Sequence, residues 1–285
     1  MRGAPETMRV LRPRSPAEAV RLYGRHPEAL PLAGGTDVMV GWNAGLLNRR
    51  TVLDLSPLRE WSRIRRTRAG LVVGALATHA RIRDDTRVRA AFPLLAEAAS
   101  VIGAAAIQNR GTLGGNIANA SPAGDSFPPL AVYEAVVHTI SPDGERRSRF
   151  LNVFEGPKAT ALRPAELIAA VELPFLPKRP TRQIFRKIGT RAAQALSKTV
   201  AAGLLWLDGK GRVEELRFAL GAMAPTVRRL RTAEAFLAGQ RLTPATVDRA
   251  VELLGEDVAP IDDVRSTSAY RLAVSRALLR GFLQG

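Results

Sequence analysis

Apolar positions along the first half of the chain alternate between strand-like and helix-like spacing. Ser15, Pro16 and Glu18 form a capping pattern that predicts a helix over residues 16–25. Short apolar or β-branched runs predict strands, at residues 30–33, 51–55, 71–76 and 166–173. The first of these strands stops at a pair of glycines, and residues 37–42 are expected to open another helix.

The middle of the chain combines a predicted helix, a glycine-rich segment and a hairpin. An alanine-rich stretch predicts the helix over residues 92–105, and it leads into a second glycine-rich segment at residues 111–125, which is expected to be a loop. Residues 131–140 and 145–151 then flank the turn sequence Ser-Pro-Asp-Gly, which predicts the hairpin.

A proline-rich stretch interrupts the pattern, because three prolines fall within residues 174–180. We place the main domain boundary there. The second lobe is predicted to hold three strands, at residues 183–188, 199–207 and 212–221. Three helices should follow, near residues 232–238, 244–254 and 268–283, the middle one with Thr243 as its N-cap and Pro244 at its first position.

Composition restricts the class of protein. The 285 residues are 46% hydrophobic, which suits two or three packed lobes. No stretch is long and apolar enough to span a membrane, and the N-terminus lacks the apolar core of a secretory signal, so we expect a cytoplasmic protein. The absence of cysteine excludes disulfides and thiolate ligands for iron–sulfur clusters on this chain. Three well-separated histidines also make a metal site unexpected.

The formal charge of +16 comes almost entirely from arginine. Such a charge attracts acidic partner surfaces or polyanions. The arginines occur in short clusters without interleaved aromatic residues, which makes nucleic-acid binding the less favoured interpretation. Solvated faces and contacts with other subunits are the favoured one.

Two segments with paired glycines carry the candidate chemistry. They are Ala33-Gly34-Gly35-Thr36-Asp37 and Thr112-Leu113-Gly114-Gly115-Asn116. Paired glycines allow a sharp turn and a close approach, so that several backbone N–H groups can converge on phosphate oxygens. The alternative is that each pair makes only a tight turn. Neither segment matches the Rossmann or P-loop pattern, so a nucleotide site here implies a different fold.

Polar residues within and after the second segment favour a ligand over a simple turn. Asn116, Asn119, Ser121 and Asp125 supply more hydrogen-bonding groups than a turn needs. Asp125 is suited to accept from a ribose or ribityl hydroxyl, although it is equally a residue type that caps its own loop.

Four stretches, in this order, resemble the FAD-binding subunit of the xanthine dehydrogenase and carbon monoxide dehydrogenase family of molybdenum hydroxylases. They are PLAGGTDVMVGWNAG (31–45), TLGGNIANASPAGDSFPPLAVYEA (112–135), FRKIGTRAAQALSKTVAA (185–202) and DDVRSTSAYRLAVSRALLR (262–280). The resemblance implies an α+β fold of the PCMH type. Its FAD-binding domain would span residues 1–176, with subdomains of about 1–56 and 57–176. A C-terminal domain at 181–285 would hold a three-stranded antiparallel sheet and a helical bundle.

Carried over position by position, the resemblance implies a set of FAD-binding residues. Those in the first segment are Pro31, Leu32, Ala33, Gly34, Gly35, Thr36, Asp37 and Val38. Those in and after the second are Thr112, Leu113, Gly114, Gly115, Asn116, Asn119 and Asp125. Outlying contacts are expected at Ile102, Ile168 and Lys187. Lys187 would either tune the flavin by its charge or be an ordinary lysine on a strand surface.

The implied function is electron transfer. A partner large subunit would hold the molybdenum cofactor, a small subunit would hold [2Fe–2S] clusters, and FAD on this chain would pass electrons to NAD or another acceptor. Many relatives have acidic residues shortly after the position of Arg191, where this chain has Gln194-Ala195-Leu196-Ser197, as in some bacterial purine-type subunits. A xanthine-type dehydrogenase is therefore favoured. The alternatives are a stand-alone flavin oxidoreductase and a basic nucleic-acid-binding protein.

Overall fold

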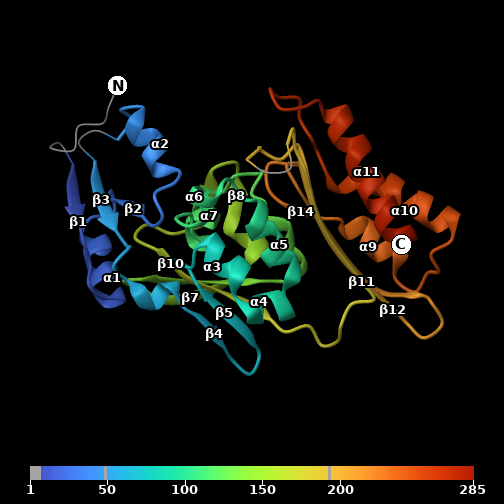
Figure 1. The fold of residues 1–285 in the computed structure, drawn as a ribbon, viewed down its shortest axis with the longest axis horizontal. Helices are drawn as coiled ribbons and strands as arrows, with labels where there is room; N and C mark the ends of the chain where they lie inside the picture. Colours follow the sequence, from blue (N-terminus) through green and yellow to red (C-terminus); the bar gives the residue numbers. More distant parts are fainter. Residues whose placement is uncertain (1–7, 48–49, 192–193) are drawn as a thin grey trace.

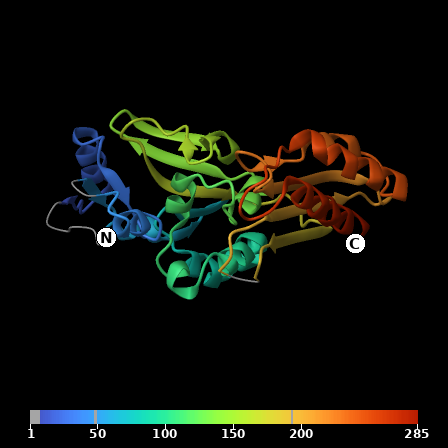
Figure 2. The same ribbon diagram turned by 90° about the horizontal axis from the view of Figure 1, so that it is seen from above.

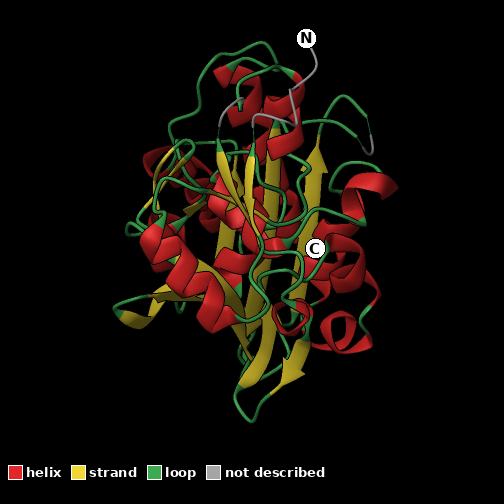
Figure 3. Cartoon of the chain, turned by 90° about the vertical axis from the view of Figure 1, so that its left-hand side faces the viewer, coloured by secondary structure: helices red, strands yellow, loops and turns green. Residues whose placement is uncertain are grey.

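The computed structural model describes residues 8–47, 50–191 and 194–285, so residues 1–7 and 48–49 of the predicted first subdomain and residues 192–193 lie outside the described part. The three larger β-sheets of the described chain follow one another along the long axis of the molecule, from the N-terminal sheet at one end to the C-terminal sheet at the other (Figures 1 and 2). Viewed along that axis, strands run through the middle and helices flank them on both sides (Figure 3). No helix in the described ranges is both long and apolar enough to cross a membrane.

The N-terminal sheet is parallel, with strand order β1-β3-β2. Its strands are β1 (Arg9–Leu11), β2 (Leu30–Leu32) and β3 (Thr51–Asp54). Helix α1 (Pro16–Arg25) has the predicted bounds, and the Ser15 side chain caps it by accepting from the Glu18 N–H at 3.2 Å. After β2 the chain turns into the short helix α2 (Val38–Asn43), as the glycine pair predicted.

The middle sheet is antiparallel, with strand order β4-β5-β10-β6-β7. Its strands are β4 (Ile64–Arg66), β5 (Gly70–Gly74), β6 (Val136–Ser141), β7 (Gly144–Arg149) and β10 (Leu167–Pro174). The predicted hairpin is β6–β7. Short elements complete this part: the 3-10 turns η2 (Arg59–Ser62) and η3 (Phe150–Val153), and the small hairpin β8 (Phe154–Gly156) and β9 (Ala159–Thr160).

Six helices of the described chain belong to the middle part, and all of them except the short α6 contribute to the core of its sheet. They are α3 (His79–Asp84), α4 (Thr86–Ala91), α5 (Pro93–Val101), α6 (Ala105–Gln108), α7 (Leu113–Asn119) and α8 (Phe127–Val132). Two predictions were wrong in detail. The helix expected over residues 92–105 ends at Val101, because Gly103 takes a left-handed φ of 59°. Residues 131 and 132, expected in a strand, close helix α8, which Pro128 and Pro129 favour at its first turn.

The C-terminal sheet contains the three predicted strands, β11 (Arg182–Ile188), β12 (Thr199–Leu207) and β13 (Val213–Gly221), all antiparallel. The two-residue strand β14 (Arg228–Arg229) extends its edge. Helices α9 (Arg231–Leu237), α10 (Pro244–Asp257) and α11 (Ser268–Gln284) pack on it, and α10 starts at Thr243 as predicted. Strand β12 is buried along nearly its whole length, because helix α8 also contacts this sheet.

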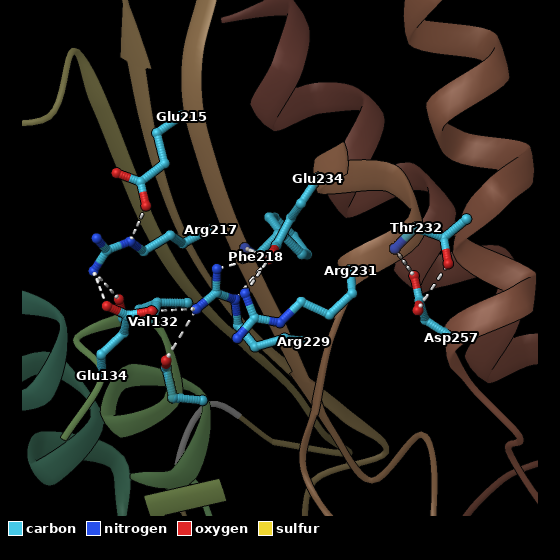
Figure 4. A network of polar contacts seen from close by, with 11 residues as sticks. Val132, Glu134, Glu215, Arg217, Phe218, Arg229, Arg231, Thr232, Glu234 and Asp257 are labelled. Carbon is cyan, nitrogen blue, oxygen red and sulfur yellow. Dashed lines mark hydrogen bonds and ion pairs between the residues drawn. The ribbon is translucent and has the colours of Figure 1, made fainter. Parts of the chain in front are cut away.

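Arginines of the C-terminal sheet bond to the end of helix α8 (Figure 4). Arg217 donates to the Val132 carbonyl at 3.3 Å, and Arg229 donates to the Ala131 carbonyl at 3.4 Å. Both also pair with Glu134. Ala131 and Val132 are the last residues of the helix and are buried, and the Ala131 carbonyl also accepts from the Glu134 N–H at 3.3 Å. The arginines add cationic donors to these acceptors at the negative end of α8. The contact joins the middle and C-terminal parts.

Candidate dinucleotide site

A cavity of about 610 Å³ lies between the N-terminal sheet and the middle part. Its wall comes from the β2–α2 segment, from the residues that follow β5, from the stretch that leads into α7, and from residues 160–168. This volume falls within the range of small-molecule and cofactor sites. The cavity is the candidate functional site.

The two glycine segments meet at this cavity. A Cβ atom on Gly34 would overlap the carbonyl oxygen of Arg110 and lie 3.1 Å from the Cα of Gly111. A Cβ on Gly111 would lie 3.4 Å from Oγ1 of Thr36. Glycine is thus required at position 34, where the two backbones touch. Segments more than 70 residues apart in the printed sequence form one continuous wall.

The first segment offers a run of backbone donors to the cavity. Gly34, Gly35, Thr36, Asp37 and Val38 all line it, and Gly35 has a φ of 79°. Within the described ranges, none of their five N–H groups donates to a protein acceptor. Consecutive unpaired amides in a turn form an anion-binding concavity. Helix α2 has only six residues, so the amides, more than a helix dipole, account for this character.

The second segment is the start of helix α7, and its backbone donors are already used. The N–H of Leu113 donates to the Ala77 carbonyl at 3.0 Å, and that of Gly114 donates to the Ala75 carbonyl at 2.8 Å. The next two residues donate to Thr112. The Gly115 N–H donates to Thr112 Oγ1 at 3.1 Å, and the Asn116 N–H donates to the Thr112 carbonyl at 2.9 Å. The hypothesis that backbone amides of both segments converge on phosphates is wrong for these four groups.

The glycines of α7 instead allow close packing. A Cβ on Gly114 would lie 2.6 Å from the Cβ of Ala75, and one on Gly115 would lie 2.9 Å from Thr112 Oγ1. The second segment therefore braces the first, and it presents side chains to the cavity at Thr112, Asn116 and Asn119. Asn119 already accepts from the Lys158 ammonium at 2.5 Å.

Most of the residues expected to bind FAD line the cavity. They are Pro31, Ala33, Gly34, Gly35, Thr36, Asp37, Val38, Ile102, Thr112, Gly114, Gly115, Asn116, Asn119 and Ile168. Four others do not line it: Leu32, Leu113, Asp125 and Lys187. Leu113 is wholly buried in the core, and Leu32 lies in strand β2.

Asp125 and Lys187 form a buried ion pair behind the cavity wall. Lys187 Nζ lies 2.6 Å from Asp125 Oδ2 and donates to the Val101 carbonyl at 3.0 Å, while Ser197 donates to Asp125 Oδ1 at 2.5 Å. The two ionic side chains are only 5% and 9% exposed, so the interpretation of Lys187 as a surface lysine is wrong. Burial raises the pKa of Asp125 although Lys187 and Ser197 act in the opposite direction.

Glu166 lines the cavity and was not among the expected residues. Its side chain is 3% exposed and pairs with Arg146 at 2.7 Å. Burial acts to raise its pKa, but hydrogen bonds from Arg146, Thr139 and the Arg163 N–H outweigh it and lower the pKa to about 2. A single acidic residue at the start of an apolar run gave no signal of this network.

Tyr23 and His79 also line the cavity without having been expected there. Burial raises the pKa of Tyr23 and lowers the pKa of His79 to about 4. Neither group changes its protonation state near neutral pH, so neither is suited to acid–base catalysis there. His79 is instead a neutral imidazole beside Gly111, whose carbonyl accepts from the His79 backbone N–H at 3.0 Å.

Burial of neutral His79 predicts a pH dependence of stability. Its pKa falls from 6.5 in the unfolded chain to about 4 in the folded protein. The contribution of neutral His79 to the free energy of unfolding should be fully present above pH 6.5. It should decrease toward pH 4, because the unfolded chain takes up the proton first. By pH 4.5 we expect a loss of about 2–3 kcal/mol from this group.

Urea unfolding of the FAD-free chain at pH 7.5 and pH 4.5 measures this loss. His79→Gln should reduce the difference in the free energy of unfolding between pH 7.5 and pH 4.5. The contributions of Glu166 and Asp125 to this difference should be the same in the wild type and in the variant. An unchanged difference in His79→Gln would contradict the assignment of His79 as the titrating group.

The fold is of neither Rossmann nor P-loop type, and its cavity has the volume and the backbone donors that suit a cofactor site. Residues 6–176 match the family model described as the FAD binding domain in molybdopterin dehydrogenase, and residues 184–285 match that of the CO dehydrogenase flavoprotein C-terminal domain. The chain belongs to the family of FAD-binding, or medium, subunits of the molybdenum hydroxylases, which includes xanthine dehydrogenase and carbon monoxide dehydrogenase. It is thus an oxidoreductase subunit, and the predicted family is confirmed.

Curated relatives match over nearly the whole chain. The xanthine dehydrogenase FAD-binding subunit of Escherichia coli O157:H7 is 31% identical over 265 residues, covering 93% of this chain and 90% of the relative. The carbon monoxide dehydrogenase medium chain of Afipia carboxidovorans is 31% identical, covering 94% and 93%. The glyceraldehyde dehydrogenase medium chain of Sulfolobus acidocaldarius is 28% identical, covering 96% of each.

Solved structures confirm the predicted fold class. The carbon monoxide dehydrogenase from Hydrogenophaga pseudoflava aligns with a TM-score of 0.91 at 27% identity, covering 97% of this chain and 96% of the other. Quinoline 2-oxidoreductase from Pseudomonas putida 86 aligns with a TM-score of 0.90 at 26% identity, covering 100% and 97%. The α+β flavoprotein fold and its C-terminal sheet and helices are therefore shown.

Proposed function

We propose that this chain binds one FAD in the cavity between its N-terminal and middle parts. The observation that carries the proposal is the run of five residues from Gly34 to Val38, which line the cavity with backbone N–H groups that have no acceptor in the described part of the chain, next to the second glycine segment. These donors suit the negatively charged diphosphate of FAD. The cavity-lining residues given above are the proposed contacts, while Leu32, Leu113, Asp125 and Lys187 would support the wall from behind.

The protein's part in the reaction is to bind, orient and shield the cofactor. FAD, when bound, would supply two-electron and one-electron redox chemistry. Val38 and the other first-segment residues would hold the diphosphate, while Ile102 and Ile168 give the cavity apolar walls that exclude water. The Asp125–Lys187 pair would hold Val101, and with it the adjoining Ile102, in place. No proton transfer by this chain is required.

We further propose that the chain works in a complex in the cytoplasm. A large subunit would carry the molybdenum cofactor and a small subunit [2Fe–2S] clusters, since this chain has no cysteine to ligate a cluster. Electrons would pass to NAD or another acceptor, and the basic surface would dock acidic faces of the partners. Residues 1–176, with subdomains of about 1–56 and 57–176, and residues 181–285 would be the domains.

A xanthine-type complex is the favoured assignment. It is supported by the resemblance of Gln194-Ala195-Leu196-Ser197 to purine-type subunits and by the relative from Escherichia coli. Subunits named for xanthine, carbon monoxide and glyceraldehyde all lie at 28–31% identity to this chain. Such even similarity fits a subunit that serves the common acceptor step, with the hydroxylated substrate selected on another chain.

A stand-alone flavin oxidoreductase is the rival function, and two residue types suited to acid–base catalysis, His79 and Tyr23, line the cavity. Their shifted pKa values, lowered for the histidine and raised for the tyrosine, argue against it. The nucleic-acid alternative required glycine segments that only turn, whereas these segments build a cavity.

Purification of the tagged chain from its native host tests the proposal. We expect co-purification of a molybdenum-containing and an iron–sulfur subunit, and an oxidised-flavin absorption spectrum that remains when the chain is isolated. A colourless chain that binds no added FAD would contradict the FAD assignment. A yellow chain that is reduced by a small organic substrate without partners would favour the stand-alone enzyme.

A further inference from the structure

Asn116 is held from behind by a buried serine. Ser126 is 1% exposed, and its hydroxyl donates to Asn116 Oδ1 at 2.6 Å. An asparagine amide has one acceptor oxygen and two donor hydrogens on its nitrogen. With the oxygen bonded to Ser126, the nitrogen is the part of the amide left for other partners.

The Asn116 nitrogen is available to the cavity. Asn116 lines the cavity, and within the described ranges no protein acceptor takes the hydrogens of Nδ2. Among described residues, Arg271 Nε is the one wholly buried side-chain nitrogen or oxygen without a partner, so Asn116 Nδ2 is not sealed in the protein interior. Because Asn116 lines the cavity, its donor hydrogens are accessible to a ligand bound there.

Ser126 itself is fixed by both neighbouring parts of the fold. It directly precedes helix α8, all six residues of which are buried, and its carbonyl accepts from the Leu130 N–H at 3.1 Å. On one side, Asp125 is bonded to Lys187 and Ser197. At the far end of α8, the arginines of β13 and β14 bond to the last carbonyls, as Figure 4 shows. A support of this kind is what holds a binding group in a single orientation.

We propose that Ser126 is a positioning residue for FAD, which sets the amide of Asn116 so that its NH₂ group donates to an acceptor atom of the cofactor. This inference rests on the proposed FAD function. It gives helix α8 a role in the site, because the C-terminal sheet reaches the cavity through α8, Ser126 and Asn116. Flavin carbonyls, ring nitrogens and phosphate oxygens are all acceptors, and donor-bearing Asn116 would recognise any of them.

A double-mutant cycle on FAD affinity tests the coupling. The Kd of the FAD-free chain for FAD is measured by flavin fluorescence for the wild type, Ser126→Ala, Asn116→Ala and the double variant. Each single variant should raise Kd about fivefold to tenfold, as expected for one lost hydrogen bond. In the double variant, Kd should match that of Asn116→Ala. Equal effects of Ser126→Ala with and without Asn116, or no effect at all, would overturn the proposal.

Asn116→Asp separates donor from acceptor. Aspartate can still accept from Ser126 but offers no donor at neutral pH. We expect it to weaken FAD binding at least as much as Asn116→Ala, and wild-type affinity in Asn116→Asp would overturn the donor role. This variant also keeps the test valid if Ser126→Ala fails to fold. If the wild type itself binds no FAD, the proposed function fails, and the two failures are distinguished.

Ser275→Ala is the matched control. Ser275 is wholly buried and its hydroxyl hydrogen-bonds to Thr199 Oγ1 at 3.1 Å, within the C-terminal part and away from the cavity lining. The Ser275→Ala variant should leave the Kd for FAD unchanged, and a weakening of FAD binding equal to that of Ser126→Ala would count against the proposal.

ADP and FMN, used as competing ligands, then show which half of FAD carries the acceptor atom. If the Ser126→Ala and Asn116→Ala variants lose affinity for FMN alone, the acceptor lies on the flavin half. If they lose affinity for ADP alone, it lies on the adenosine half.

Discussion

Gly115→Val should abolish FAD binding while leaving the fold largely intact. Gly115 lines the cavity at the seam between the two glycine segments. A Cβ there would lie 2.9 Å from Thr112 Oγ1 and 3.8 Å from the Cβ of Ala33, so the two methyl groups of valine must extend into the seam or the cavity. We expect the Kd for FAD to rise at least about 100-fold, since a ligand cannot share space with a packed side chain.

The cost to folding should be small by comparison. Displacing Thr112 Oγ1 weakens the bond that caps α7, which is a loss of about 1 kcal/mol. The measurement is the visible spectrum of the purified variant with an FAD titration of the FAD-free chain. Gly281→Val is the matched control, because a Cβ at Gly281 in helix α11 would meet no atom within 4 Å beyond the nearby backbone of its own helix. Normal FAD affinity in Gly115→Val would place the cofactor elsewhere.

Local signals in the sequence predicted the longer strands and the C-terminal helices, but not the short helices α3, α4, α6 and α7. The Ser15 and Thr243 caps fix the starts of α1 and α10, and runs of β-branched residues identify the long strands. The two-residue strand β14 was missed because Arg228 and Arg229 have no strand-like pattern. They pair with β13 because neighbouring structure places them at its edge, so tertiary context decided their conformation.

The site was predictable in its backbone and much less so in its side chains. Paired glycines mark close approaches, and the structure brings Gly34 and Gly111 into contact. Which amides stay free was not readable from the sequence, because the Gly114 N–H is taken by Ala75, in a segment almost 40 residues earlier. The pairing of Asp125 with Lys187, 62 residues apart, depends in the same way on tertiary packing. Long-range partners of this kind leave no periodic signal.

Replacing Glu234 with alanine should cause the largest loss of stability. The Arg229 side chain is 3% exposed and that of Glu234 is 8% exposed, and two hydrogen bonds of 2.6 and 2.8 Å join them (Figure 4). Glu234 also accepts from the Phe218 N–H at 2.9 Å. Removing the carboxylate leaves a buried guanidinium and a buried amide without this partner. We expect a loss of about 3–5 kcal/mol in the free energy of unfolding.

Urea unfolding of Glu234→Ala is best compared with Glu252→Ala. Glu252 pairs with Arg249 at 2.9 Å, but both side chains are more than half exposed, at 65% and 54%. Water already solvates that pair, so its loss should cost less than about 1 kcal/mol. The double variant Arg229→Met/Glu234→Leu should recover much of the stability, because no buried charge then remains unpaired. Equal losses of unfolding free energy in Glu234→Ala and Glu252→Ala would show that burial does not determine how much the Arg229–Glu234 pair contributes to stability.

The same variant separates stability from cofactor binding. Arg229 bonds to the last turn of α8, and α8 begins beside Ser126, which holds Asn116 at the cavity. If Glu234 acts only on the C-terminal core, Glu234→Ala should lower stability without changing FAD affinity in the folded fraction. If the shifted Arg229 moves α8, the Kd for FAD should rise as well, and the rise should disappear in an Asn116→Ala background. The second outcome is the one expected from the contacts that link the C-terminal sheet to the cavity.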